Sequence, residues 1–392
     1  MSTVRINVEP TVIQSAVIKS GRSFEEVKKR FSSYDKWINN ELNPTYNQLV
    51  DLSKFLRIPF GFLLVKTPVN EELPLLEFRT IDTEAIQTPS RELIDTIYDM
   101  ERKQEWLRDN MIEDGNDPLD FVGIFKKNIT YMQAADRIRS VFNLNKNWYK
   151  KTNSKKSTFN YLRDLFSQYG IVVMQNGIAL NNTHRPLDLE EFRAFTLVDD
   201  YAPLIFLNNL DSNNGKTFSL LHEVAHIFFG IDSLYNDDFK KRNKYNSSIE
   251  TICNKIAGEL IAPKDLFINY WTATYEHEEN VNEKIRNIAN EFKVSKIVVA
   301  RKALDQNYIS EKQYDEVAAL VRNEFQLNHK RKKLQKGGNS VNNALSRLDE
   351  NFIRTLITNT EFGETQYNEA YRLAGVSRGV FEDLSERLKG VR

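Results

Sequence analysis

The sequence predicts an α+β fold that is mostly helical and contains one small three-stranded sheet. Apolar residues recur at helical spacing through most of the chain, whereas three short β-branched and aromatic runs stand close together between residues 171 and 208. The 392 residues exceed one ordinary domain of roughly 100–200 residues, so we expect several small domains.

The composition is typical of a globular protein. Hydrophobic residues make up 41% and charged residues 28% of the chain, and the formal net charge of zero gives no indication of nucleic-acid or membrane binding. The sequence has no window of about 18 consecutive apolar residues and no signal-peptide core, so we expect a cytoplasmic protein. The single cysteine, Cys253, excludes an internal disulfide and a zinc cluster built from thiolates alone.

The N-terminal part of the chain, before residue 150, is expected to be helical. Residues 10–65 show apolar groups at helical spacing, broken by the turn residues Gly21, Pro44 and Pro59, and predict a compact helical unit. A long amphipathic helix is predicted from Pro89 to Met111, and it could join two domains. A shorter helix follows around residues 134–142.

The three strands follow a helix around residues 161–166. They are the runs IVVM at 171–174, FRAFTLV at 192–198 and PLIFLN at 203–208, which Asn, Asp and Pro separate. Helical patterns then continue to the end of the chain. The basic run KRKKLQKGGNS near residue 330 interrupts them, and we interpret it as a solvated linker.

The run TFSLLHEVAHIFFG at residues 217–230 predicts a helix that carries a metal site. Because a helix advances about 100° per residue, His222 and His226 project from nearly the same face and can bind one tetrahedral Zn²⁺. Zinc lowers the pKa of a water molecule that it binds, and Glu223 is placed to accept its proton as a general base. The HExxH pattern arises by chance, but buried His and Glu in so apolar a helix are unfavourable unless something pairs with them.

A third ligand is expected on the helix ETICNKIAGELIAP, residues 250–263, which Pro263 ends. Glu250 and Glu259 are the acidic candidates. Glu250 shares a face with Asn254 and the small Ala257, which favours close packing on the HEVAH helix, whereas Glu259 is displaced from that face. We therefore favour Glu250, although an acid in a first helical turn also has a simpler explanation in the helix dipole.

The remaining candidates receive no catalytic role. Cys253 lies one turn from Glu250 and could approach the metal, but a buried and inert thiol is the expected state. His184, His277 and His329 lie in polar surroundings. Zinc is the preferred metal, although Mn²⁺ could occupy a His/His/Glu site in vitro.

HEVAH followed by ETICNKIAGELIAP resembles the ImmA/IrrE family of bacterial and phage metallopeptidases. The resemblance extends over nearly the whole chain through LPLLEFRT at 73–80, the Arg-Lys-Gln-x-x-Trp run ending at Trp106, and residues 337–357. It implies a reduced zincin fold of the gluzincin type, with the sheet packed on two metal-binding helices. It also implies the ligands His222, His226 and Glu250 and the catalytic Glu223.

Longer members of this family often carry a helix-turn-helix unit, and residues 22–56 resemble one. The segment SSYDK between Phe31 and Trp37 is too short for the usual turn and full recognition helix. Residues 1–65 contain about nine basic against six acidic residues, a weak excess that would neutralise few phosphates. A protein-binding or vestigial unit is therefore at least as well supported as one that reads DNA.

These observations favour a zinc endopeptidase of narrow specificity, and the family resemblance implies that it cleaves a partner repressor of transcription, in a stress, mobile-element or phage circuit. We expect the substrate to lie as an extended strand along residues 203–208. The alternatives are a metal-binding, DNA-associated regulator without proteolysis and an adaptor that acts by binding alone. We expect a helix-turn-helix-like unit at residues 1–66 and a helical connector at 67–150. The metallopeptidase domain follows at 151–275, and a C-terminal helical domain at 276–392.

Overall fold

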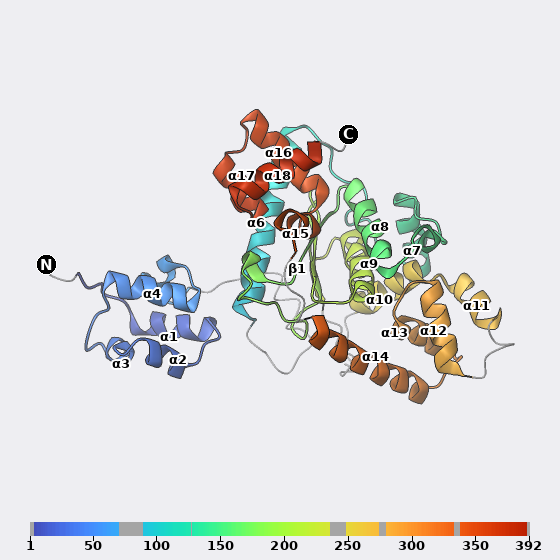
Figure 1. The fold of residues 1–392 in the computed structure, drawn as a ribbon, viewed down its shortest axis with the longest axis horizontal. Coiled ribbons are helices and arrows are strands. Elements are labelled where there is room, and N and C mark those ends of the chain that lie inside the picture. The colour runs from blue at the N-terminus through green and yellow to red at the C-terminus, as the bar shows by residue number, and fades with distance from the viewer. Residues whose placement is uncertain are drawn as a thin grey trace. The chain divides into compact units, whose positions relative to one another are not determined.

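The computed structural model describes most of the chain (Figure 1). The described residues are 4–69, 89–126, 128–235, 248–273, 280–332 and 338–389. Their contacts divide the chain into two compact units, Met1–Tyr98 and Asp99–Arg392. The expected four-part division stays a prediction, and the segment 73–80 that carries part of the family resemblance lies outside the described residues.

Short helices packed around an apolar core form the first unit (Figure 1). They are α1 (Pro10–Lys19), α2 (Phe24–Arg30), α3 (Tyr34–Ile38), α4 (Tyr46–Leu56) and the 3-10 helix η1 (Phe60–Leu63). Ser23 and Thr45 begin α2 and α4 because each side chain accepts the free backbone N–H three residues on, in a capping box. Val17, Trp37 and Leu52 are buried in the core of this unit.

The long helix predicted from Pro89 is α6 (Arg91–Glu113), and the boundary between the two units falls within it. In the second unit, the buried side chain of Gln104 on α6 donates to the carbonyl oxygens of Leu197 and Ala202 at 2.8 and 3.0 Å. These hydrogen bonds attach α6 to the turn that follows the second strand of the sheet.

The second unit confirms the mostly helical α+β fold, but its sheet has four strands among the described residues where three were expected. They are β1 (Val172–Asn176), β2 (Ala194–Leu197), β3 (Leu204–Asn208) and β4 (Ser233–Tyr235). The first three match the predicted runs. β4 was missed because three residues directly after a helix are too few to show the alternation that marks a strand.

The strand order is β1-β3-β2-β4, and it corrects the expected position of the substrate. β3 pairs in parallel with β1 and antiparallel with β2, so residues 203–208 lie inside the sheet and offer no edge. The prediction was wrong because β3 inserts between β1 and β2, an arrangement that depends on contacts between distant segments. β4 pairs with β2 and ends the strand order on the other side.

Residues near 346–349 cover the β1 edge. The carboxylate of Asp349 accepts the backbone N–H of Val173, and the Gln175 side chain donates to the carbonyl oxygen of Ser346 at 2.6 Å. The Arg163 guanidinium donates to the carbonyl oxygens of Ser346 and Leu348. The outward backbone N–H of Val173 and the side chain of Gln175 are therefore already engaged by the chain itself at this edge.

Helices pack on the sheet and share one large hydrophobic core that runs from Phe121 to Val317. The helices before and within the metal-binding region are α7 (Tyr131–Val141), η2 (Trp148–Lys151), α8 (Lys155–Gln168), η3 (Ala179–Asn181), α9 (Asn213–Phe229) and α10 (Ser248–Ile261). α9 packs against the sheet, α8 and α10. Gly230 ends α9 with a left-handed φ of 68°, as the sequence indicates.

The remaining helices follow in chain order. They are α11 (Lys264–Ala273), α12 (Val281–Glu291), α13 (Lys296–Asp305), α14 (Glu311–Lys332), α15 (Ser340–Arg347), α16 (Glu350–Phe362), α17 (Tyr367–Ala374) and α18 (Arg378–Lys389). The run 330–340, expected as a linker, is helical up to Lys332 and again at Ser340, and residues 333–337 lie outside the described part. Trp106 stacks edge-on against Phe352 with ring centroids 5.6 Å apart, so two segments of the family resemblance touch each other.

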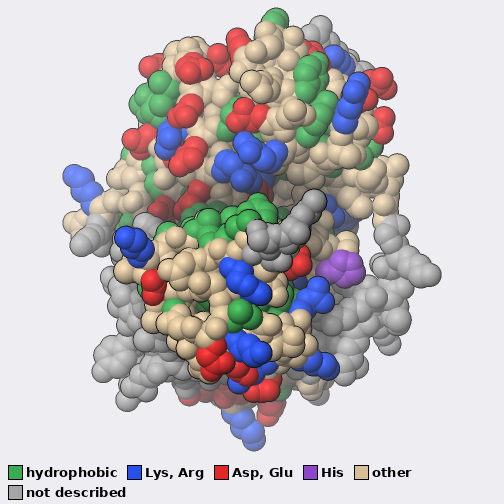
Figure 2. Space-filling model, turned by 90° about the vertical axis from the view of Figure 1, so that its left-hand side faces the viewer, with side chains coloured by type: hydrophobic (Ala, Val, Ile, Leu, Met, Phe, Trp, Pro, Cys, Tyr) green, Lys and Arg blue, Asp and Glu red, His purple; other side chains and the backbone are tan. Residues whose placement is uncertain are grey.

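Among the residues that the structure describes, no helix combines the length and the apolar character needed to cross a bilayer. On the face drawn in Figure 2, basic and acidic side chains are interspersed, in keeping with the net charge of zero.

Candidate metal centre

Three predicted ligands meet between α9 and α10. His222 and His226 are buried one turn apart on α9, and their Nε2 atoms lie 3.1 Å from each other. Glu250, in the first turn of α10, reaches both rings: its Oε2 lies 3.3 Å from Nε2 of His222 and its Oε1 lies 3.2 Å from Nε2 of His226. The chain therefore brings two imidazole nitrogens and one carboxylate to a single point.

The spacing of these ligand atoms fits a zinc ion. Bonds of about 2.0–2.1 Å in tetrahedral geometry separate neighbouring ligand atoms by about 3.3 Å. The three observed separations lie between 3.1 and 3.3 Å. Two nitrogens and one carboxylate oxygen are also the donor set of catalytic zinc sites with one open position. The donor set therefore suits zinc: the two short contacts of Glu250 run to different carboxylate oxygens, and one ligand atom from each residue lies within 4.8 Å of the others.

The electrostatics of the cluster favour a cation. Burial opposes ionisation of Glu250, but hydrogen bonds from His222 and His226 hold the pKa of its carboxyl far below the usual range. Burial likewise opposes the charged form of His226, yet its contacts with Cys253 and Glu250 raise its pKa well above the ordinary value. A negative carboxylate that attracts positive charge onto an adjacent imidazole also attracts a metal ion.

Asn254 fixes the orientation of His222. Its Oδ1 lies 3.0 Å from Nδ1 of His222, so Nδ1–H donates to the amide oxygen and Nε2 is the ring nitrogen left for a metal. The ring of Tyr235 on β4 packs against the same imidazole, with centroids 4.1 Å apart. Sequence reasoning gave Asn254 only a packing role, although its spacing one turn after Glu250 carried the signal.

Glu223 is fully buried and lies beside the ligands without joining them. Its Oε2 accepts the hydroxyl of Thr196 on β2 at 2.5 Å and the hydroxyl of Ser233 on β4. Its Oε1 has no hydrogen-bond partner among the described residues. Burial raises the pKa of this carboxyl, and the nearby imidazoles and the two hydroxyls counteract that rise. The roles of Thr196 and Ser233 were not visible in the sequence, because no local pattern links two strands to one helix.

Glu259, the alternative third ligand, lies elsewhere. Nine residues at 100° each place it about 180° around α10 from Glu250. Its carboxylate, 5% exposed, accepts Nζ of Lys302 at 3.0 Å and the backbone N–H of Lys264 at 3.0 Å. Arg139 donates to the Glu259 carbonyl oxygen at 2.6 Å. Glu259 therefore satisfies buried cations on the far side of the helix.

Of the other candidates, Cys253 contacts the ligand His226, and none of them joins the three-residue ligand group among the described residues. Cys253 is buried, as expected, and burial raises the pKa of its thiol. His184 is exposed. His277 and the side chain of His329 lie outside the described part of the chain.

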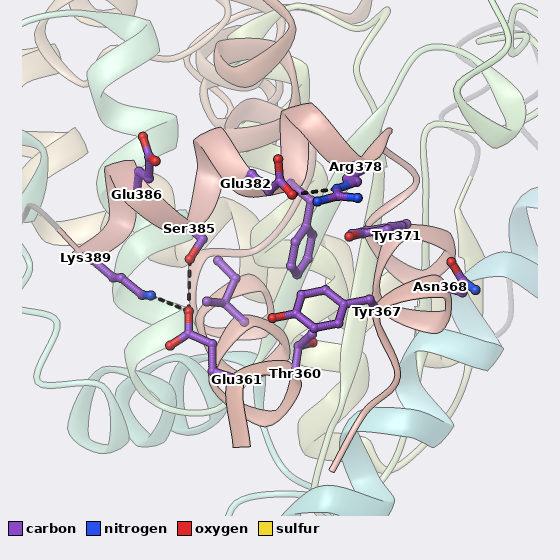
Figure 3. A pocket seen from close by; sticks show the side chains of 12 residues that line it. Thr360, Glu361, Tyr367, Asn368, Tyr371, Arg378, Glu382, Ser385, Glu386 and Lys389 are labelled. Atoms are coloured by element: carbon purple, nitrogen blue, oxygen red, sulfur yellow. Dashed lines mark hydrogen bonds and ion pairs between the residues drawn. The ribbon is translucent and has the colours of Figure 1, made fainter. Parts of the chain in front are cut away.

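A second concavity of about 580 Å³ lies between α16, α17 and α18 (Figure 3). Four of its charged groups pair within the pocket, since Glu361 binds Lys389 and Ser385, and Glu382 binds Arg378 at 2.7 Å. None of the predicted site residues lines it. It is therefore separate from the metal centre and offers no comparable set of ligands.

Comparison with known proteins adds one finding. Residues 166–304 match the family model of the IrrE N-terminal-like domain, a peptidase family designated Peptidase M78. The matched segment is less than half of the chain, and it contains the sheet, α9 and α10. No curated protein and no solved structure matches the chain.

Proposed function

Residues 166–304 form a domain of the IrrE N-terminal-like peptidase family, and from this premise we propose that the protein is a zinc endopeptidase of narrow specificity. One observation carries the proposal. His222, His226 and Glu250 converge at one point, and the neighbouring Glu223 carboxyl, whose Oε1 has no hydrogen-bond partner among the described residues, interacts electrostatically with both histidines. A purely structural zinc site is closed by a fourth protein ligand, and the described residues supply three.

The chemistry divides among the residues of the chain. Zinc, when bound, supplies a Lewis acid that polarises the scissile carbonyl and lowers the pKa of a water molecule. His222, His226 and Glu250 hold the ion, and Asn254 keeps His222 in the tautomer that binds it. Oε1 of Glu223 accepts the proton of the attacking water, and the same carboxyl then passes that proton to the leaving amine.

We place the substrate beside β4. The β1 edge is engaged by residues near 346–349, and β3 lies inside the sheet. β4 ends the strand order on the side of the metal centre, where Ser233 contacts Glu223 and Tyr235 packs on His222. An extended peptide that adds to a sheet edge gains main-chain hydrogen bonds and brings its carbonyl groups past the site.

The proposed substrate is a partner repressor of transcription, cleaved in a stress, mobile-element or phage circuit in the cytoplasm. The family resemblance of the metal-binding region and the helix-turn-helix-like character of residues 22–56 support this proposal. A narrow specificity follows if the helical regions around the peptidase restrict access to β4.

Peptide profiling tests the proposed activity. The zinc-loaded protein and its Glu223→Gln variant are incubated with a proteome-derived peptide library and with any repressor encoded by a neighbouring gene, and new termini are identified by mass spectrometry. We expect a small set of related cleavage sites that disappear with Glu223→Gln and with a zinc chelator. Identical termini from both proteins, or none from either, would contradict proteolysis by this site.

A further inference from the structure

The carboxylate of Glu223 is held unevenly. Thr196 and Ser233 both donate to Oε2, whereas Oε1 has no partner among the described residues. Thr196 and Ser233 are cross-strand partners on β2 and β4, so the sheet itself sets the spacing between the two hydroxyls. A carboxylate with two donors on one oxygen cannot rotate freely about its Cγ–Cδ bond without breaking both hydrogen bonds.

Because these side chains are buried, their hydrogen bonds are hard to replace. Glu223 and Thr196 are fully buried, and Ser233 is 2% exposed, so water cannot readily replace a lost hydroxyl. Apolar residues of similar size would fill the space equally well, so packing alone does not account for two hydroxyls aimed at one oxygen.

We propose that Thr196 and Ser233 are positioning residues that fix the Glu223 carboxylate through Oε2 and so direct Oε1 towards the attacking water. This inference rests on the proposed function, because the orientation of the Glu223 carboxylate matters only if Glu223 acts as the catalytic base. β4 then has two tasks, because the strand that we place next to the substrate also holds the base.

The assignment predicts a loss in turnover rather than in binding. In the double variant Thr196→Val/Ser233→Ala, kcat should fall by about 10- to 100-fold, the range found when groups that orient a metal site are removed. KM and zinc content should stay unchanged, because neither hydroxyl is a ligand. Thr196→Ser in an otherwise native chain keeps the hydroxyl and should retain most of the activity.

Thr217→Val is the matched control. The Thr217 hydroxyl is as deeply buried and lies on the same helix as Glu223, but it donates to the Asn213 carbonyl oxygen at 2.8 Å. We expect this control to leave kcat unchanged. Equal losses in kcat for Thr217→Val and for the double variant would overturn the assignment, as would a rise in KM with unchanged kcat in the double variant.

A second measurement needs no activity. A double-mutant cycle on the free energy of unfolding of the zinc-free protein compares Thr196→Val in the native background and beside Glu223→Leu. Loss of the hydroxyl should destabilise the native background and be neutral or stabilising beside Leu, because no carboxylate is left to bind. An equal loss in both backgrounds would show that the hydrogen bond is absent. Lack of cleavage by the native protein would instead contradict the proposed function, so the two failures are distinguishable.

Discussion

Oδ1 of Asn254 lies 3.0 Å from Nδ1 of His222, across the interface between α10 and α9. The same helix that supplies Glu250 therefore also orients one of the two imidazole ligands. This contact couples zinc affinity to the packing of the two helices.

Removal of this acceptor should weaken zinc binding. Asn254→Ala leaves Nδ1 of His222 without a partner in a buried site, and the ring is then free to rotate or change tautomer. We expect the Kd for zinc to rise by about 10- to 100-fold, measured by competition with a chromophoric chelator. Asn254→Asp keeps an acceptor oxygen and should retain tight binding. Equal affinities for Asn254→Ala and the native protein would remove Asn254 from the site.

Substitutions of the two glutamates of α10 should have different effects, one on zinc affinity and the other on the free energy of unfolding. Glu250→Gln should weaken zinc binding by at least about tenfold, because it removes the anionic ligand. Glu259→Gln should leave zinc affinity unchanged but reduce the free energy of unfolding by about 1–3 kcal/mol, since it leaves the partly buried Lys302 without its counter-ion. Zinc titration and denaturant unfolding of both variants measure this. Reversed effects would mean that the third ligand is Glu259.

Local patterns predicted much of this architecture. The 3.6-residue repeat indicated α6, and the HEVAH run with Gly230 indicated α9 and its end. The choice of Glu250 over Glu259 needed only the 100° rotation per residue, and the structure places these two side chains on opposite sides of α10.

The features that sequence reasoning missed depend on contacts between distant segments. β4 is too short to show a periodic pattern, and the insertion of β3 between β1 and β2 leaves no local trace. For the same reason the convergence of Thr196 and Ser233 on Glu223 could not be predicted. Such information resides in strand order, which local patterns in a single sequence do not supply.

The first unit should prove dispensable for the metal centre. All three ligands and Glu223 lie in the second unit, so a protein lacking residues 1–66 should bind zinc as tightly as the full chain. Partner recognition or activation should change. Zinc content and unfolding of the shortened protein test the first expectation, and loss of the metal on truncation would contradict it.

Specific DNA binding should be absent or weak. α3, at the place of a recognition helix, has five residues, and its exposed positions are Asp35 and Lys36. Asp35 pairs with Lys28 at 3.1 Å and would repel phosphates. Helix-turn-helix proteins typically prefer their site by a factor of thousands over random DNA at physiological salt. A selectivity of that size, lost on deletion of residues 1–66, would favour the DNA-associated regulator instead.

Zinc content measured beside cleavage tests the central claim most directly. The native protein should hold about one zinc per chain, His222→Ala and His226→Ala should lose most of it, and Glu223→Gln should keep it while cleaving nothing. Full zinc content in both histidine variants, or undiminished cleavage by Glu223→Gln, would contradict the account.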